Sequence, residues 1–95
     1  MDDKEEFVEE LIENPIPMTH TLREFDIKDV AGIMKYFPEW KLKIREYITR
    51  DASDEIEFII NSLQLTEQEA GDILLKFKER MDYFEENPPL IKYKK

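Results

Sequence analysis

The chain has 95 residues, no cysteine and a formal net charge of −9 at pH 7. A chain of this length forms one domain with a single modest core, and without cysteine it has neither disulfides nor thiolate metal sites. Its acidity argues against nucleic-acid binding, and the lack of a membrane-length apolar run or a basic-then-apolar leader predicts a cytoplasmic protein with no membrane segment.

The first predicted element is an acidic amphipathic helix within residues 1–14. Its expected extent is about 3–13, with glutamates around a narrow apolar stripe. The stripe consists of Phe7, Val8, Leu11 and Ile12. A helix this short is not stable alone in water, so it must dock on its own bundle or on another chain.

Residues 15–20 form a predicted proline-bounded linker before a helical bundle over 21–87. Its two prolines favour extended backbone and lack helical hydrogen-bond donors. The single histidine, His20, falls in this linker and is expected to be an exposed loop residue. Residues 21–24 are expected to form a short capped turn.

A capping side chain followed three positions later by a carboxylate occurs at Asp26 and again at Thr66. This spacing predicts a helix over about 27–36 and a long helix that starts after Thr66 and ends before Asn87. The forty-residue period also suits a helical repeat, but two copies are fewer than such arrays need. A compact bundle that uses one kind of helix start twice is the favoured interpretation.

Pro38 ends the helix before it and suits the first position of the next, which is predicted over about 38–50. Residues 51–53 are predicted to cap a fourth helix, whose apolar face ends at Leu63. The expected fold class is all-α, a compact bundle of about five short helices with the longest at the C-terminal end. A tail follows over 88–95.

No catalytic, cofactor-binding or metal-binding residue is predicted. One histidine supplies neither a metal ligand set nor an acid–base pair, and both glycines fall inside helices rather than in a phosphate-binding loop. The acidic run 51–55 begins with calcium-loop spacing but lacks the glycine and the final glutamate of such a loop. An enzyme that works through carboxylates alone is the least favoured hypothesis, and no small-molecule substrate is evident.

Apolar side chains that point away from their own helical stripes occur on four predicted helices. They are Tyr36, Leu42, Phe58, Leu75 and Tyr83. They indicate a second covered surface, and the leading hypothesis is a non-enzymatic protein–protein interaction or regulatory module, with a homodimer as one form. Burial within a crowded bundle explains these residues equally well. The predicted partner contacts are Phe7, Leu11, Ile12, Leu42, Phe58 and Leu75.

The second hypothesis is a small helix-turn-helix DNA-binding regulator. Ile27-Lys28-Asp29-Val30-Ala31 resembles the opening of the first helix in lactose-repressor-type DNA-binding headpieces, where a glycine-centred turn and a recognition helix follow. Here Lys35-Tyr36-Phe37-Pro38 stands at the turn without glycine, and the spacing to the next helix is about three residues longer than in that family. The resemblance implies a motif built from the helices over 27–36 and 38–50.

Basic and aromatic residues alternate over 35–50, a stretch with a net charge of +3, and such a mixture can bind phosphates and stack on bases. The predicted nucleic-acid contacts of this second hypothesis are Lys41, Lys43, Arg45 and Arg50. A core-facing aromatic stripe with solvated basic residues on either side is the favoured account of the same segment.

Overall fold

In the computed structural model the described residues are 7, 10, 11 and 16–87. The helices with described bounds are α2 (Pro17–Leu22), α3 (Ile27–Tyr36), α4 (Pro38–Arg45), α5 (Arg50–Ser62) and α6 (Glu67–Glu86). The predicted all-α bundle is confirmed, and α6, its longest described helix, lies at the C-terminal end. No described helix combines the length and the apolar character needed to span a membrane.

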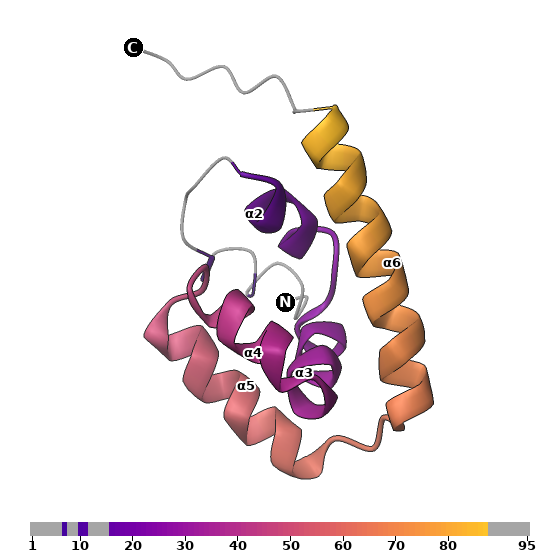
Figure 1. The fold of residues 1–95 in the computed structure, drawn as a ribbon. Coiled ribbons are helices and arrows are strands. Elements are labelled where there is room, and N and C mark those ends of the chain that lie inside the picture. Colours follow the sequence, from indigo (N-terminus) through magenta and orange to yellow (C-terminus); the bar gives the residue numbers. More distant parts are fainter. Residues whose placement is uncertain (1–6, 8–9, 12–15, 88–95) are drawn as a thin grey trace.

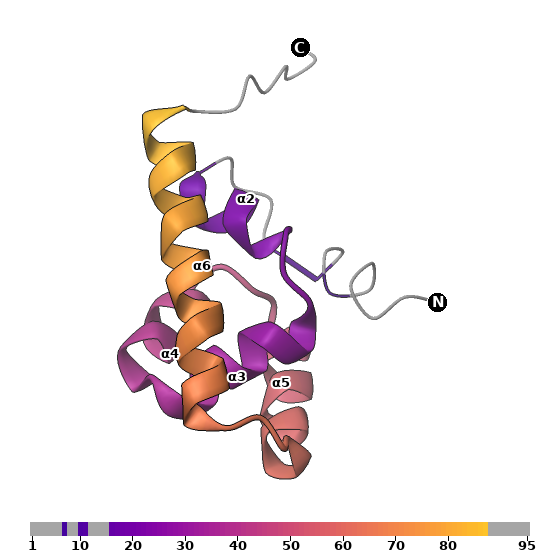
Figure 2. The same ribbon diagram turned by 90° about the vertical axis from the view of Figure 1, so that its right-hand side faces the viewer.

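Helix α3 lies at the centre of the bundle and contacts α4, α5 and α6. Helix α6 runs along one side, with α2 against its C-terminal half and α3 against its N-terminal half (Figures 1 and 2). A bidentate pair between Arg80 and Glu24, with nitrogen–oxygen distances of 2.7 and 3.0 Å, joins α6 to the segment just after α2. The bundle is therefore organised around two helices, α3 and α6.

The core consists of residues from the inward faces of several helices. Helix α3 buries six of its ten residues, namely Ile27, Val30, Ala31, Gly32, Ile33 and Met34. Helix α6 contributes Ala70, Leu74 and Phe77. The Phe77 ring is fully buried, with ring centroids 5.2 Å from Phe25 and 5.8 Å from Trp40. Phe77 therefore joins three segments in one aromatic cluster.

The two predicted capping boxes have different outcomes. At Thr66 both bonds are present: the Glu69 amide donates to Thr66 Oγ1 (3.1 Å) and the Thr66 amide donates to Glu69 Oε1 (2.9 Å). At Asp26 the side chain makes no capping bond, although α3 begins at the next residue as predicted. Only the second helix start is therefore a complete capping box.

The boundary between α4 and α5 differs from the sequence prediction. Helix α4 ends at Arg45, five residues before the expected end, and α5 already begins at Arg50. The cap is Thr49, whose hydroxyl accepts a hydrogen bond from the Ala52 amide at 3.2 Å, rather than residues 51–53. Arg50 consequently belongs to α5.

The predicted linker over 15–20 and the turn over 21–24 also need correction, because residues 17–22 form the helix α2. Pro17 occupies the first turn of this helix, where its missing donor costs nothing and its fixed φ favours helix. The Thr21 hydroxyl donates to the Pro17 carbonyl oxygen at 2.7 Å, four residues earlier in this six-residue helix.

The described residues of the N-terminal segment pack on their own bundle. Phe7 and Leu11 are only 1% and 5% exposed and belong to the core cluster. Leu11 pairs with Ile48 in an isolated antiparallel bridge. The Thr49 amide donates to the Glu10 carbonyl oxygen (2.9 Å), and the Thr49 hydroxyl donates to the Glu10 carboxylate (2.6 Å). The rest of the predicted helix over 3–13 and the tail over 88–95 lie outside the described residues.

His20 is a half-buried helical residue rather than an exposed loop residue. Its Nε2 atom is buried without a hydrogen-bond partner, and its ring lies 5.7 Å from that of Phe84 on α6. Desolvation, and to a smaller extent the positive charge of Arg23, lower the pKa of His20 below its usual value of 6.5. The folded protein therefore prefers the neutral imidazole.

This preference predicts that the protein loses stability as the pH falls. Below a pH of about 6.5 the unfolded chain binds a proton that the folded chain resists, so the free energy of unfolding decreases towards the folded pKa. We expect the free energy of unfolding, measured with denaturant, to fall between pH 7.5 and pH 5.5. This fall should be larger in the wild type than in His20→Phe, which cannot titrate at this position. An equal pH dependence in both proteins would contradict this role for His20.

Candidate interaction surfaces

A cleft of about 650 Å³ opens where the start of α3, the end of α5 and the connection to α6 meet. Its lining residues are Asp26, Lys28, Asp29, Ile59, Ser62, Leu63, Gln64, Leu65 and Glu69. The sequence indicates several of these residues only as helix caps or as members of an apolar stripe. It does not predict that they line a common cleft.

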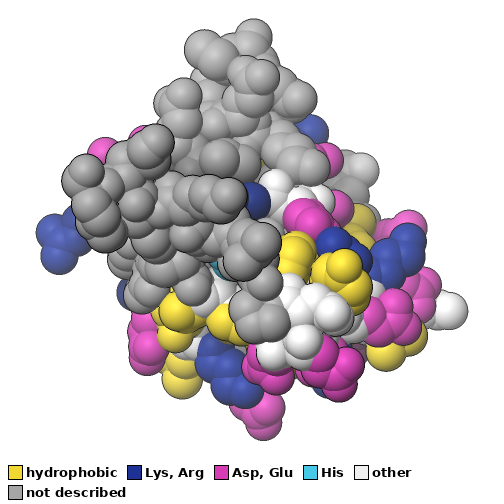
Figure 3. All heavy atoms as spheres, turned by 90° about the horizontal axis from the view of Figure 1, so that it is seen from above, with side chains coloured by type: hydrophobic (Ala, Val, Ile, Leu, Met, Phe, Trp, Pro, Cys, Tyr) yellow, Lys and Arg dark blue, Asp and Glu magenta, His cyan; other side chains and the backbone are white. Residues whose placement is uncertain are grey.

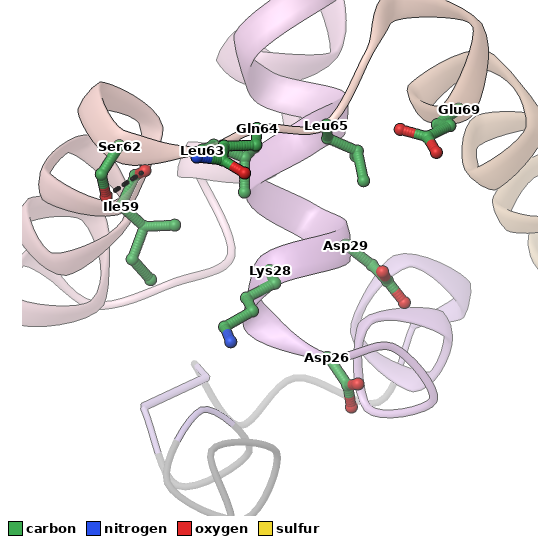
Figure 4. Close-up of a pocket in the computed structure, with 9 residues that line it drawn as sticks. All are labelled: Asp26, Lys28, Asp29, Ile59, Ser62, Leu63, Gln64, Leu65 and Glu69. Carbon is green, nitrogen blue, oxygen red and sulfur yellow. Dashed lines mark hydrogen bonds between the residues drawn. The ribbon is translucent and has the colours of Figure 1, made fainter.

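The two sides of this cleft differ in chemistry (Figure 4). Asp26, Asp29 and Glu69 place carboxylates on the side formed by α3 and α6. Apolar side chains from α5 and the α5–α6 connection form the other side, chiefly Ile59 and Leu63. The single lysine of the cleft, Lys28, points away from Asp29 and Glu69 in this view. The cleft therefore combines negative charge with an apolar wall.

The rim of the cleft is held in place by side chains of α3. The Tyr36 hydroxyl donates to the Leu65 carbonyl oxygen at 2.7 Å, and Lys35 Nζ donates to the Leu63 carbonyl oxygen at 3.2 Å. The Leu65 side chain lies over Gly32, where an added Cβ would collide with it. With the capping box at the start of α6, these contacts fix the connection between α5 and α6, so the cleft is largely preformed.

Phe58 lies on α5 one turn before the lining residue Ser62 and is not itself a lining residue of the cleft. It is 75% exposed, the most exposed of the large apolar side chains described. Residues four apart on a helix are neighbours on one face, and Ser62, which lines the cleft, is four residues after Phe58. The ring is therefore placed to extend the apolar wall outward along α5.

The six predicted partner contacts fall into three groups. Leu42, Phe58 and Leu75 are exposed, by 66%, 75% and 60%, and lie on three different helices. Phe7 and Leu11 are buried in the core of their own chain. Ile12 lies outside the described residues. The interface itself stays a prediction.

Tyr36 and Tyr83, the other two residues predicted to point away from their helical stripes, also differ from each other in the structure. Tyr83 is exposed, as the periodicity predicts. Tyr36 is half-buried and uses its hydroxyl to hold the rim of the cleft. A tyrosine that appears surplus by periodicity is therefore a structural residue here.

Two of the four predicted nucleic-acid contacts are engaged within the protein. Lys41 forms a 2.7 Å salt bridge with Glu57 of α5, and Lys43 Nζ lies 4.6 Å from the centroid of the Trp40 ring. Arg45 and Arg50 are exposed on consecutive helices. The DNA-binding hypothesis stays a prediction.

A second, smaller cleft of about 300 Å³ lies between the start of α4 and the middle of α6. Phe37, Trp40 and Leu74 supply its apolar surface, and Lys78 lies at its edge with Nζ 6.0 Å from the Trp40 ring centroid. Because lysines 43 and 78 both lie over Trp40, much of that aromatic face is already in use. We regard this cleft as the weaker binding surface.

Two further features of the described residues concern metal ligands and surface patches. No group of three or more histidine, cysteine, aspartate or glutamate side chains in this part of the chain is arranged to hold a metal ion. On the face seen in Figure 3, the hydrophobic side chains of the described part form small patches among acidic and basic ones. Of the two clefts described, the larger combines carboxylates with aliphatic side chains and is the stronger candidate binding site.

Comparisons with known proteins provide no further assignment. No protein-family model matches the chain, and neither a curated protein nor a solved structure is similar to it.

Proposed function

We propose that this chain is a non-enzymatic protein-interaction module, and that its cleft between α3, α5 and α6 binds a short segment of basic and apolar residues from another protein chain. The observation that carries the proposal is the composition of the cleft, which has carboxylates on one side and aliphatic side chains on the other. An alternating basic and apolar segment presents complementary groups to both sides.

Electrostatics over a wider area favours the same kind of ligand. Residues 51–72 contain seven acidic residues and no basic one, a net charge of −7. Such a field steers cationic segments towards the α5–α6 region. Exposed apolar area at Phe58 supplies additional contact, and burying most of an aromatic ring contributes about 1.5–3 kcal/mol.

The proposal predicts selective binding of designed peptides. In fluorescence anisotropy titrations, a labelled peptide that alternates leucine with lysine should bind, whereas one that alternates leucine with glutamate should not. A third peptide that alternates serine with lysine measures attraction by charge alone and should bind more weakly. Phe58→Ser should weaken binding of the first peptide about tenfold, which corresponds to about 1.4 kcal/mol of lost ring burial.

Tyr83→Ser is the matched control, because it removes an exposed aromatic ring of α6 at the end away from the cleft. It should leave the affinity unchanged. Equal binding of the two lysine peptides, or no effect of Phe58→Ser, would overturn the proposed site.

A further inference from the structure

The composition and reach of residues 88–95 identify an occupant for this cleft. We propose that the segment 88–95 of one copy of the chain binds in the cleft of a second copy, an inference that rests on the proposed function. The segment carries three lysines and no acidic residue. The cleft carries three carboxylates and one lysine, so the two have opposite net charge.

The apolar residues of the segment also fit. Leu90 and Ile91 precede the lysines and Tyr93 lies between two of them, so the segment offers both apolar and basic groups to a cleft with one acidic and one aliphatic side. Carbonyl groups in the last turn of α5 add a partial negative charge at the same place. Lys28 opposes a cationic ligand, but its side chain points away from Asp29 and Glu69 (Figure 4).

Geometry favours a second copy over the segment's own cleft. Glu69, at the cleft, and Asn87, just after the end of α6, are 18 residues apart, which corresponds to about 27 Å along the helix. Eight fully extended residues span at most about 26–29 Å. Asp26 is nearer, because the adjacent Phe25 packs on Phe77, ten residues before Asn87, so the lysines at the end of the segment can approach that edge of the cleft in their own chain. Leu90 and Ile91 follow Asn87 by only three and four residues, which is too short to reach Leu63 and Leu65 beside Glu69, so these two residues can enter that part of the cleft only in another copy.

Each copy has one such segment and one such cleft. When two copies exchange segments reciprocally, the contacts close into a twofold dimer and no site remains open for further growth. This reciprocal exchange is the assembly that we expect, whereas a head-to-tail chain of copies would leave one cleft and one segment open at its ends. Because charge contributes to the contact, the dimer should weaken as the salt concentration rises.

The first test is the mass of the full chain by sedimentation velocity between about 10 μM and about 1 mM, a range that brackets weak association. The wild type should shift from monomer to dimer. A variant with Lys92→Glu, Lys94→Glu and Lys95→Glu should remain monomeric. If the wild type is monomeric throughout, or the triple variant dimerises as the wild type does, the inference is wrong.

The second test uses a labelled synthetic peptide of residues 87–95 as the probe. Asp26→Lys should weaken its binding to the triple variant at least fivefold, since it reverses a charge of the cleft. Asp82→Lys, an equal charge reversal on an exposed part of α6 away from the cleft, should have no such effect. Equal weakening by both variants would show non-specific attraction and overturn the inference.

The two proposals fail in different ways. Binding of the leucine–lysine peptide without binding of the 87–95 peptide would retain the interaction module and refute this occupant. Absence of binding by both peptides would refute the module as well.

Discussion

Phe77→Ala is expected to lower the free energy of unfolding by about 3–5 kcal/mol. The Phe77 ring is fully buried and contacts the rings of Phe25 and Trp40. Its removal leaves a cavity between α6, the start of α3 and α4, and the two remaining rings cannot both move to fill it. A domain of this size has a total stability of about 5–15 kcal/mol, so the variant should be partly unfolded at moderate temperature.

Urea unfolding followed by circular dichroism measures this loss. Leu75→Ala is the matched control, because Leu75 lies two residues away on the same helix with 60% of its surface exposed. Its effect should stay within about 0.5 kcal/mol. A comparable loss in both variants would contradict the assigned inner and outer faces of α6.

Helix starts with strong local signals could be predicted from the sequence. Helix α3 begins and ends at the predicted residues, 27 and 36, and α6 starts after the capping box at Thr66. In both cases the signals that determine the boundary lie within a few residues of it. Pro38 is a further example, since it ends one helix and opens the next.

Boundaries that depend on distant contacts could not be predicted in this way. Thr49 and residues 51–53 are comparable caps by sequence, and the bonds between Thr49 and Glu10, 39 positions away, favour Thr49. Pro17 presents another ambiguity, because proline can either break a helix or begin one. Packing of α2 on α6, with Arg80 bound to Glu24, is consistent with the second outcome.

The cleft could not be predicted for the same reason. It brings together some of the residues within 26–29 and 59–65 with Glu69, and its rim depends on the Tyr36–Leu65 bond between positions 29 residues apart. Helical periodicity shows which residues of one helix share a face, but not which ends of three helices meet. The excess of acidic residues over 51–72 is visible in the sequence, whereas the apolar wall beside it requires the fold.

Phe7→Ala is expected to have the second large effect, a decrease of about 3 kcal/mol in the free energy of unfolding. Phe7 is 1% exposed and packs in the same core cluster as α3 and α6. The Thr49 amide, which donates to the Glu10 carbonyl oxygen, should also exchange its hydrogen faster in this variant, because the segment that covers it is held less tightly.

Phe58→Ala is the control of choice, since it makes the same chemical change at a phenylalanine that is 75% exposed, and it should leave stability within about 0.5 kcal/mol of the wild type. If Phe7→Ala were equally neutral, the segment would be detached in solution. Phe7 and Leu11 would then be available to a partner, as the sequence hypothesis holds. If instead Phe7→Ala lowers the free energy of unfolding strongly and Phe58→Ala does not, the N-terminal segment that contains Phe7 and Leu11 is part of the core. A partner would then bind to the exposed face of α5 and the nearby cleft.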